Sequence, residues 1–467
     1  MSHFAASPIR GRLAARLWRR RELLHLFLAV GSCFWGGLHA AAAETPTTVN
    51  EISVEARRIF VDANIPGGNI VVEGIDGDTV YLRPDLRDTE GWWFYWNFRV
   101  GAAPGRAVQF QFSGRNPIGV RGPAVSTDGG RSWSWLGAQV VHGGAFDYTF
   151  ADDAGEARFC FAMPYQEEDL REFLARHDDS AHLAVRELCR TRKGRSVERL
   201  HAGRLDGDAT YKVLLTARHH ACEMMASYSL EGVLETVLGD DDDGRWFRRN
   251  VEVLAVPFMD KDGVEDGDQG KNRKPHDHNR DYVGKSIYPS VAALRTLVPN
   301  WSNGHLTAAL DLHCPYIRGP HNEVIYIVGS SDEAMWRRQC QFGRLLERLQ
   351  SGPLVYRASD NLPFGQSWNT ASNFDKGISC SRWACGLDGI ALVAPFEIPY
   401  ANAGGKPVMA PSARAFGRSL GRAIRQFLEG IASQPHDIEK AVLPAGSERC
   451  QTKPVRRQCT SCTIRRP

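Results

Sequence analysis

The chain contains 467 residues, of which 43% are hydrophobic and 24% are charged, and its formal net charge is +3. This composition is ordinary for a globular protein, and the length predicts two or more domains. A small net charge spread over this length gives no reason to expect nucleic-acid binding, which needs concentrated positive charge. We therefore expect no nucleic-acid partner.

The beginning of the chain has the pattern of an export signal. A cluster of arginines within residues 10–21 precedes the apolar run 23–38, and small residues follow at 40–43. This order is typical of a cleavable signal peptide, which we place at residues 1–43. The apolar run is too short and too rich in glycine for a stable membrane span. We expect a periplasmic or secreted protein. A twin-arginine route, a lipoprotein anchor at Cys33 and a disordered leader of a cytosolic protein are the alternatives.

Residues 50–165 are predicted to form an antiparallel β-sandwich domain. Short apolar runs, such as Trp92 to Val100, alternate there with turn residues, and Asp128-Gly129-Gly130 is a hairpin signal. The aromatic residues of the first run are expected in the core, with a sugar-binding platform as the alternative. A helix over residues 166–177 is expected to connect this domain to the next.

Residues 180–432 alternate between strand and helix patterns. The predicted buried strands are Tyr211 to Ala217, Val251 to Phe258, Leu306 to Leu312 and Ile390 to Phe396, and the predicted helices include Met224 to Leu238 and Ala410 to Ile431. This alternation predicts an α/β sheet with a functional site at the strand ends. The polar, glycine-rich segment 259–270 is expected to be an exposed loop. Residues 433–467 form a basic tail that contains cysteines.

Residues with metal-binding chemistry follow two of these strands. His220 and Glu223 lie in the turn before the first helix, where an imidazole and a carboxylate three residues apart can reach one divalent ion. His313 ends the strand that starts at Leu306 and can supply a third ligand. Two histidines and one glutamate form the ligand set of catalytic zinc sites that keep one position open for water. Structural histidines are the alternative.

A basic segment, residues 271–281, contains candidate anion-binding groups. Arg280 has a planar fork that matches a carboxylate, and Asn279 adds an amide donor. Lys271 or Arg273 could stabilise an oxyanion. The alternative is a solvated basic loop, and the histidines of this stretch are expected at the surface.

The strand that starts at Ile390 ends at Glu397. A carboxylate at a strand end in apolar surroundings is a candidate general base, because desolvation raises its affinity for a proton. Alone, it is one acidic residue among many.

Cysteines are consistent with an exported protein. Ten of the eleven follow the leader, which permits disulfides, and Cys380 and Cys385 are close enough in sequence to pair. The tail contains Cys450, Cys459 and Cys462, for which a disulfide or disorder is expected.

These residues together resemble the zinc carboxypeptidases of the M14 type, most closely an exported bacterial member of the cytosolic-carboxypeptidase-like branch. The motifs that carry the resemblance are, in chain order, His220-x-x-Glu223, Asn279-Arg280, Asp311-Leu312-His313 and Phe396-Glu397. The β-rich region before them is similar to the N-terminal domain of that branch. The resemblance implies a mixed-sheet carboxypeptidase core preceded by the β-sandwich.

The resemblance also implies roles for individual residues. His220, Glu223 and His313 would bind Zn²⁺. Asn279 and Arg280 would hold the terminal carboxylate of a peptide or protein substrate. Glu397 would activate a water molecule and then protonate the leaving amine. The family has an arginine at the oxyanion position, where the segment from Gly270 to Arg273 leaves Lys271 and Arg273 both open, and Tyr400 is a guess for the mobile substrate-capping tyrosine.

The sequence therefore predicts a metallocarboxypeptidase that releases C-terminal residues from peptides. A group of cations could favour acidic residues such as glutamate: Lys271, Arg273, Lys274 and Arg318. Cell-wall peptides are another plausible substrate for an exported enzyme. A zinc-dependent deacylase of the aspartoacylase type and a non-catalytic exported binding protein are the alternative functions.

Overall fold

The structure is a computed structural model that describes residues 58–153 and 155–433. The predicted signal peptide at 1–43 and the tail from residue 434 onward, with its three cysteines, lie outside the described residues and stay predictions. Among the described residues, no helix is both long and apolar enough to span a membrane.

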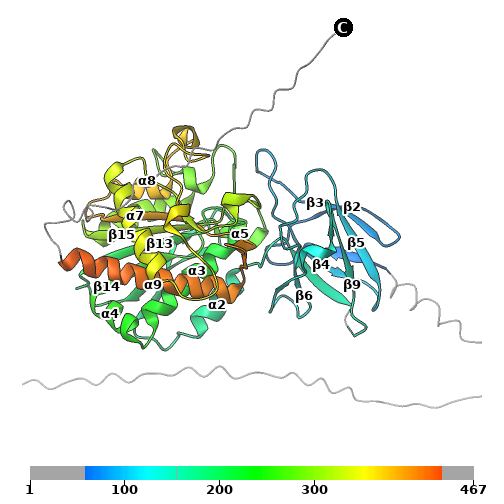
Figure 1. The fold of residues 1–467 in the computed structure, drawn as a ribbon, viewed down its shortest axis with the longest axis horizontal. Coiled ribbons are helices and arrows are strands. Elements are labelled where there is room, and N and C mark those ends of the chain that lie inside the picture. The colour runs from blue at the N-terminus through cyan, green and yellow to red at the C-terminus, as the bar shows by residue number, and fades with distance from the viewer. Residues whose placement is uncertain (1–57, 154, 434–467) are drawn as a thin grey trace, which may run out of the picture. The chain divides into compact units, whose positions relative to one another are not determined.

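The first part of the described chain consists of two five-stranded sheets (Figure 1). The first has the order β1 (Phe60–Asp62), β4 (Asn97–Gly101), β10 (Glu156–Cys160), β6 (Ala124–Ser126) and β7 (Ser134–Trp135). The second has the order β2 (Val71–Asp76), β3 (Thr79–Arg83), β5 (Ala107–Phe112), β9 (Ala145–Thr149) and β8 (Val141–His142).

The two sheets pack face to face through aromatic side chains. The ring of Phe159 in β10 lies 5.3 Å from that of Phe110 in β5 and 5.2 Å from that of Phe146 in β9, between centroids. The predicted β-sandwich is therefore confirmed. It differs in one respect, because β3 and β5 pair in parallel. The chain passes through β4 in the opposite sheet between them, and so β5 returns in the direction of β3.

Helix α2 (Glu167–Ala175) follows, where the connecting helix was predicted. The backbone N–H of Gln166 donates to the Asp169 carboxylate at 2.7 Å, which caps the first turn.

The second part of the chain is built on a seven-stranded mixed sheet. Its order is β11 (Leu183–Arg190), β12 (Ser196–Gly203), β14 (Val251–Val256), β13 (Tyr211–Ala217), β15 (Leu306–His313), β17 (Leu392–Glu397) and β16 (Tyr326–Ile327). The four central strands, β14, β13, β15 and β17, are parallel. They are the four buried strands that the sequence predicts, and their carboxyl ends meet at one edge of the sheet. A short ribbon, β18 (Asn402–Ala403) with β19 (Lys406–Pro407), completes the strands.

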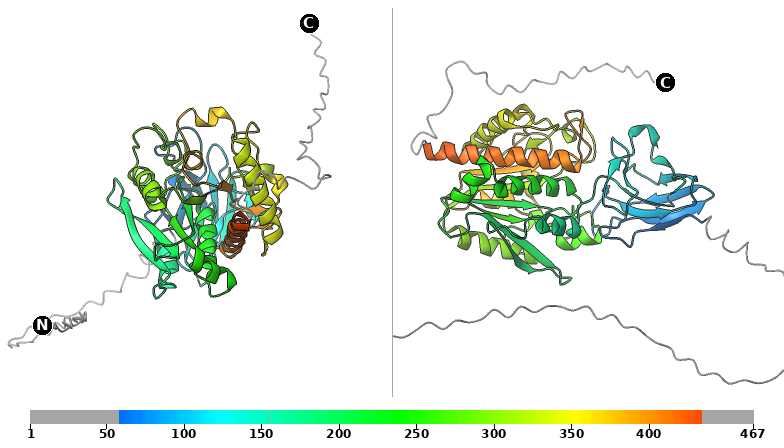
Figure 2. Two further views of the ribbon diagram at one scale, coloured as in Figure 1. Left: turned by 90° about the vertical axis from the view of Figure 1, so that its left-hand side faces the viewer. Right: turned by 90° about the horizontal axis from the view of Figure 1, so that it is seen from below.

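Helices cover both faces of this sheet (Figure 2). One face packs against α3 (Met224–Leu238), α4 (Asp242–Asn250), α7 (Glu333–Leu349) and α9 (Ala410–Ser433). The other packs against α6 (Pro289–Ser302) and α8 (Cys380–Ala384). Helices α3 and α9 run side by side. Their close approach requires glycine, because a Cβ on Gly232 would lie 2.0 Å from the Arg414 carbonyl oxygen.

The segment 259–270 is not the exposed loop that its polarity predicts. It contains α5 (Lys261–Asp266) and is largely buried. The ammonium group of Lys261 lies 3.0 Å from Glu198, and the Gln269 side chain accepts a hydrogen bond from the Tyr95 backbone at 2.7 Å. Partners distant in sequence satisfy the polar groups of this segment, and so it can be buried.

Cys380 and Cys385 do not pair, although they are close in sequence, and all cysteines in the described residues are free thiols. The two residues lie at opposite ends of α8. Because successive helical residues are rotated by about 100°, side chains five positions apart point in different directions. The Cys380 sulfur instead lies 3.8 Å from the Thr216 hydroxyl.

Candidate active site

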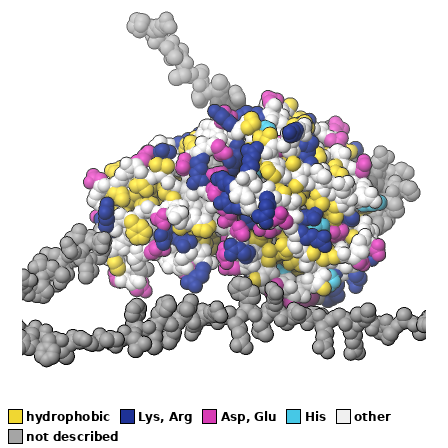
Figure 3. Space-filling view, turned by 180° about the vertical axis from the view of Figure 1, so that it is seen from behind, with side chains coloured by type: hydrophobic (Ala, Val, Ile, Leu, Met, Phe, Trp, Pro, Cys, Tyr) yellow, Lys and Arg dark blue, Asp and Glu magenta, His cyan; other side chains and the backbone are white. Residues whose placement is uncertain are grey.

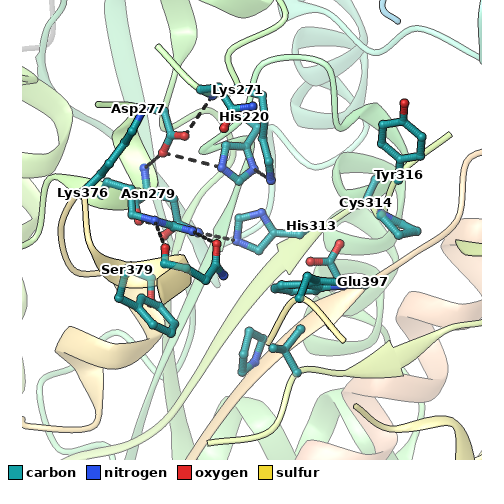
Figure 4. Close-up of a pocket in the computed structure, with 18 of the residues that line it drawn as sticks. His220, Lys271, Asp277, Asn279, His313, Cys314, Tyr316, Lys376, Ser379 and Glu397 are labelled. Atoms are coloured by element: carbon teal, nitrogen blue, oxygen red, sulfur yellow. Dashed lines mark hydrogen bonds and ion pairs between the residues drawn. The ribbon is translucent and has the colours of Figure 1, made fainter. Parts of the chain in front are cut away.

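The three predicted metal ligands meet at the carboxyl ends of two neighbouring parallel strands. His220 and Glu223 lie in the turn between β13 and α3, and His313 is the last residue of β15. Nδ1 of His220 lies 2.7 Å from one oxygen of Glu223, and Nδ1 of His313 lies 2.7 Å from the other. All three side chains are buried, with their candidate ligand atoms within 4.8 Å of one another. Figure 4 shows the two histidines beside Glu397.

A buried arginine shapes the turn that carries two of these ligands. Arg218 has a φ of 59°, a left-handed conformation that is uncommon for a residue with a side chain. Its guanidinium donates to the carbonyl oxygens of Ala221 and Tyr165 and to the hydroxyl of Ser227, at 3.0, 2.9 and 3.2 Å. These bonds hold the carbonyl that lies between His220 and Glu223 in place. This role of Arg218 could not be predicted from the sequence, because its partners become visible only in the folded chain.

Two aspartate carboxylates lie near the Nε2 atoms of the histidines. The Asp311 carboxylate lies 2.8 Å from Nε2 of His313, and that of Asp277 lies 3.7 Å from Nε2 of His220. Each imidazole therefore presents Nδ1 to the centre of the site and Nε2 toward a carboxylate, and the hydrogen bond between Asp311 and His313 is of the kind that orients metal-binding histidines. For Asp311 a signal existed in the sequence, since residues two apart on a strand share a face.

The charges around this centre fit a divalent cation. Four buried carboxylates lie around it, those of Glu223, Asp277, Asp311 and Glu397. The ammonium group of Lys271 lies 3.6 Å from Glu223 and is a single positive charge. One oxygen of Glu397 has no hydrogen-bond partner among the described residues. Buried charges of one sign need compensation, and the nitrogen and oxygen donors present suit zinc.

Glu397 lies beside the metal ligands because of the strand register. It ends β17 and is directly opposite His313 of β15. Burial, and then the negative charge of Glu223, raise the pKa of Glu397 to about 7. A carboxylate with this pKa can both accept and return a proton near neutral pH.

The predicted carboxylate-binding residues line a cavity that is also lined by the two candidate histidine ligands and by Glu397. Asn279 and Arg280 belong to the short 3₁₀ turn His278–Arg280. The Arg280 guanidinium donates to the backbone and side-chain oxygens of Asn373, at 2.9 and 2.8 Å, and lies 5.4 Å above the Phe374 ring. It forms no ion pair within the described part of the chain, and burial lowers its pKa. This guanidinium is held in place and remains available to an anion.

Lys271 and Arg273 have different surroundings. Lys271 reaches the metal-binding centre, with its ammonium group 3.2 Å from Nδ1 of His220. Gly270 permits this, because a Cβ there would lie 2.1 Å from the backbone nitrogen of Ala221. The Arg273 guanidinium is bound by three carboxylates, those of Asp88, Asp260 and Asp268. Of the two, only Lys271 has a charge directed at the site.

The histidines of the basic segment are not both at the surface. His276 is half-buried and lies 2.8 Å from the Asp281 carboxylate. His278 is buried, and its ring stacks on that of Tyr288 with centroids 3.6 Å apart. The prediction is therefore wrong for His278, since the aromatic contact replaces solvent.

The cavity at the site has a volume of about 670 Å³ and includes a residue from the β-sandwich. Trp93 lines it, and its indole N–H donates to the Cys222 sulfur at 3.4 Å. The Lys271 ammonium group lies 5.8 Å from the Trp93 ring centroid. Tyr326 also lines the cavity, whereas Tyr400 is buried in the core against Cys222. Tyr400 therefore does not fit the capping role suggested for it.

A smaller cavity of about 210 Å³ shares lining residues with the first. Arg382 lines it and lies over the Phe374 ring at 4.8 Å, with no carboxylate partner among the described residues. Asp332 also lines it, but its carboxylate caps α7 by accepting from the Met335 N–H.

Two other cations that could bind an acidic side chain of the substrate have partners elsewhere in the protein. Lys274 pairs with Glu90 at 3.3 Å. Arg318 donates to backbone carbonyls of the β-sandwich, including that of Asn116 at 2.8 Å.

Charged side chains of both signs are intermingled on the face shown in Figure 3. The absence of a nucleic-acid partner remains a prediction.

No family model matches the sequence. The chain is 29% identical over 160 residues to cytosolic carboxypeptidase 3 of Mus musculus, a match that covers 32% of this chain and 16% of that protein. It is 22% identical over 264 residues to cytosolic carboxypeptidase 6 of Caenorhabditis elegans, covering 50% of this chain and 57% of the other. The chain thus spans less than two thirds of the length of these curated relatives.

Among solved structures, a metallo-carboxypeptidase from Burkholderia cenocepacia superposes with a TM-score of 0.66 at 21% identity. The match covers 80% of this chain and 100% of the other. This likeness confirms the predicted fold, a mixed-sheet carboxypeptidase core preceded by a β-sandwich.

Proposed function

We propose that this chain, a relative of the cytosolic-carboxypeptidase-like branch of the M14 metallocarboxypeptidases, is a zinc-dependent carboxypeptidase. It would release the last residue of a peptide or protein. One observation carries the proposal: His220, Glu223 and His313 converge on one point, and the two histidines line a cavity together with Glu397 and Arg280.

The zinc ligands would be His220, Glu223 and His313. When bound there, the ion supplies a Lewis acid that polarises a carbonyl group and lowers the pKa of water. Glu397 takes the proton from the attacking water and passes it to the leaving amine. The raised pKa of Glu397 suits both transfers, because a group that titrates near the working pH can act as base and then as acid.

Different cations would bind the substrate and stabilise the oxyanion. Arg280 and Asn279 hold the terminal carboxylate of the substrate, which restricts cleavage to the end of a chain. Lys271 is the cation that stabilises the developing oxyanion. Arg273 lines the cavity as well, but its guanidinium is occupied by carboxylates, which gives it a structural role.

We also propose a preference for acidic C-terminal residues. Of the four cations from which the sequence suggested it, three are engaged elsewhere in the folded chain. Support instead comes from Arg382, which lines the smaller cavity of about 210 Å³ and has no carboxylate partner among the described residues. A glutamate side chain in that cavity would supply the missing anion.

Metal content and peptide cleavage by purified protein test this function. We expect about one zinc per chain, as a catalytic site of this type requires, and release of C-terminal residues from a peptide library read by mass spectrometry. Zinc without peptide cleavage would favour the deacylase alternative, and neither would favour a binding protein. Export to the periplasm or medium is a further proposal, which fractionation of expressing bacteria would test.

A further inference from the structure

A buried carboxylate links the candidate ligand His313 to a second histidine that the proposed mechanism does not use. One oxygen of Asp311 lies 2.8 Å from Nε2 of His313. The other lies 2.9 Å from Nδ1 of His219 and accepts from the Thr216 hydroxyl at 2.8 Å. Nε2 of His219 lies 2.7 Å from the Tyr282 hydroxyl. All five side chains are buried.

The hydrogen bonds to Asp311 have one consistent arrangement of protons, in which the Asn279 amide nitrogen, 3.2 Å from Nε2 of His313, is a neighbour of that atom and not its donor. An ionised carboxylate can only accept hydrogen bonds, and so both histidines donate to Asp311. The Tyr282 hydroxyl then donates to the second nitrogen of His219. His313 consequently has its lone pair on Nδ1, the atom that faces Glu223 and the centre of the site.

We propose that His219, held by Tyr282, is a positioning residue that sets the metal affinity of the site through Asp311. The inference rests on the proposed function, because it concerns the ion that His313 would help to bind. Groups hydrogen-bonded to a metal-binding histidine fix its tautomer and orientation, and their loss weakens metal binding about 10- to 100-fold. His219 keeps Asp311 in the orientation that faces His313.

Because the Asp311 carboxylate is buried, its orientation depends on hydrogen bonds from the side chains around it. Asp311 is 2% exposed and pairs with no lysine or arginine among the described residues, so loss of the His219 donor would leave the Thr216 hydroxyl alone on that oxygen. Without the donor at His219, the carboxylate can rotate toward Thr216 and away from His313. The ring of His313 would then lose both its fixed tautomer and its fixed orientation.

The same residues could alternatively form a second metal site. Candidate ligand atoms of His219, Asp311 and Cys380 also lie within 4.8 Å of one another. Here the hydrogen bonds already satisfy both Asp311 oxygens, which favours a network over an ion. The two readings differ in the number of metal ions bound per chain.

Two substitutions of His219 separate positioning from general stability. The amide nitrogen of asparagine occupies the place of Nδ1 and keeps the donor to Asp311, whereas that of glutamine occupies the place of Nε2 and loses it. The zinc dissociation constants of wild type, His219→Asn and His219→Gln would be measured by competition with a chromophoric chelator. Thermal unfolding of the metal-free proteins would be followed in parallel.

We expect His219→Gln to weaken zinc binding by ~10- to 100-fold, and His219→Asn to bind like the wild type within about threefold. Tyr282→Phe removes only a hydroxyl and should weaken binding by a few fold, which preserves the test if His219→Gln does not fold. The matched control is His201→Gln, which breaks a partly buried histidine–carboxylate pair, with Glu252 at 2.8 Å, on other strands of the sheet.

Equal dissociation constants for the asparagine and glutamine variants would overturn the inference, as would unaltered binding by Tyr282→Phe. Two zinc ions per wild-type chain, with one lost in Cys380→Ser, would also overturn it. Wild-type protein that binds zinc and cleaves peptides while His219→Gln binds normally would refute this inference alone. Wild-type protein that binds no zinc would refute the proposed function itself.

Discussion

Replacing Lys271 by methionine should lower activity, whereas replacing Arg273 by methionine should lower stability. Lys271 has a quarter of its side chain exposed, and the contacts of its ammonium group are with groups of the candidate site, such as Glu223 and Trp93, so Lys271→Met should fold normally. Loss of an oxyanion-stabilising group typically lowers kcat by about 10²- to 10³-fold. Removing this positive charge 3.6 Å from Glu223 should leave zinc binding intact or strengthen it.

Arg273→Met should act on stability instead. The Arg273 guanidinium is 2.6 Å from Asp260, which is 2% exposed, and 3.0 Å from Asp268. Breaking a buried ion pair by removing one partner costs about 3–5 kcal/mol. Steady-state kinetics on one peptide and urea unfolding of both variants would show the contrast. A stable but inactive Arg273→Met protein beside an active Lys271→Met protein would refute the assignment.

Four further predictions concern other parts of the molecule. Glu397→Gln should lower kcat by roughly 10²- to 10⁴-fold while the metal content, read by atomic emission, stays unchanged; near-normal turnover would exclude Glu397 as the base. Trp93→Ala should lower kcat/KM by about fivefold, since a cation–π contact with Lys271 is worth about 1 kcal/mol, and an unaffected kcat/KM would show that the β-sandwich gives nothing to the reaction. Arg382→Ala should raise KM for glutamate-ended peptides but not for alanine-ended ones; an equal change for both would remove the basis for acidic preference. Burial raises the pKa of Asp169 to about 6 from an unfolded value near 3.8, so folding is favoured below pH 4 and that advantage is lost as the pH rises through 6. Asp169→Asn should therefore gain stability over the wild type between pH 4 and pH 7, by at most roughly 3 kcal/mol, and a difference in unfolding free energy independent of pH would contradict this.

The site could be predicted where it depends on regular structure. The apolar run from Tyr211 to Ala217 predicts a strand, and the helix that follows it begins and ends at the predicted residues, Met224 and Leu238. A strand followed by a turn and a helix places His220 and Glu223 at one sheet edge. The parallel arrangement of the central strands then brings His313 and Glu397 to the same edge.

What the sequence could not show depends on contacts between distant segments. Arg273 and Lys271 look equivalent along the chain, and only the fold reveals that carboxylates from two domains surround Arg273. His219 and Asp277 resemble ordinary polar residues until their partners are known. The segment 259–270 was expected in solvent for the same reason, since polarity predicts exposure only when no buried partner exists.

X-ray absorption at the zinc edge of the purified protein tests the central claim most directly. The account predicts first-neighbour scattering from two imidazole nitrogens and a carboxylate oxygen at about 2.0–2.2 Å, and loss of the bound zinc when His313 is replaced by alanine. Scattering from sulfur at about 2.3 Å would place Cys222, Cys314 or Cys380 among the ligands. That result would contradict the assignment of the site.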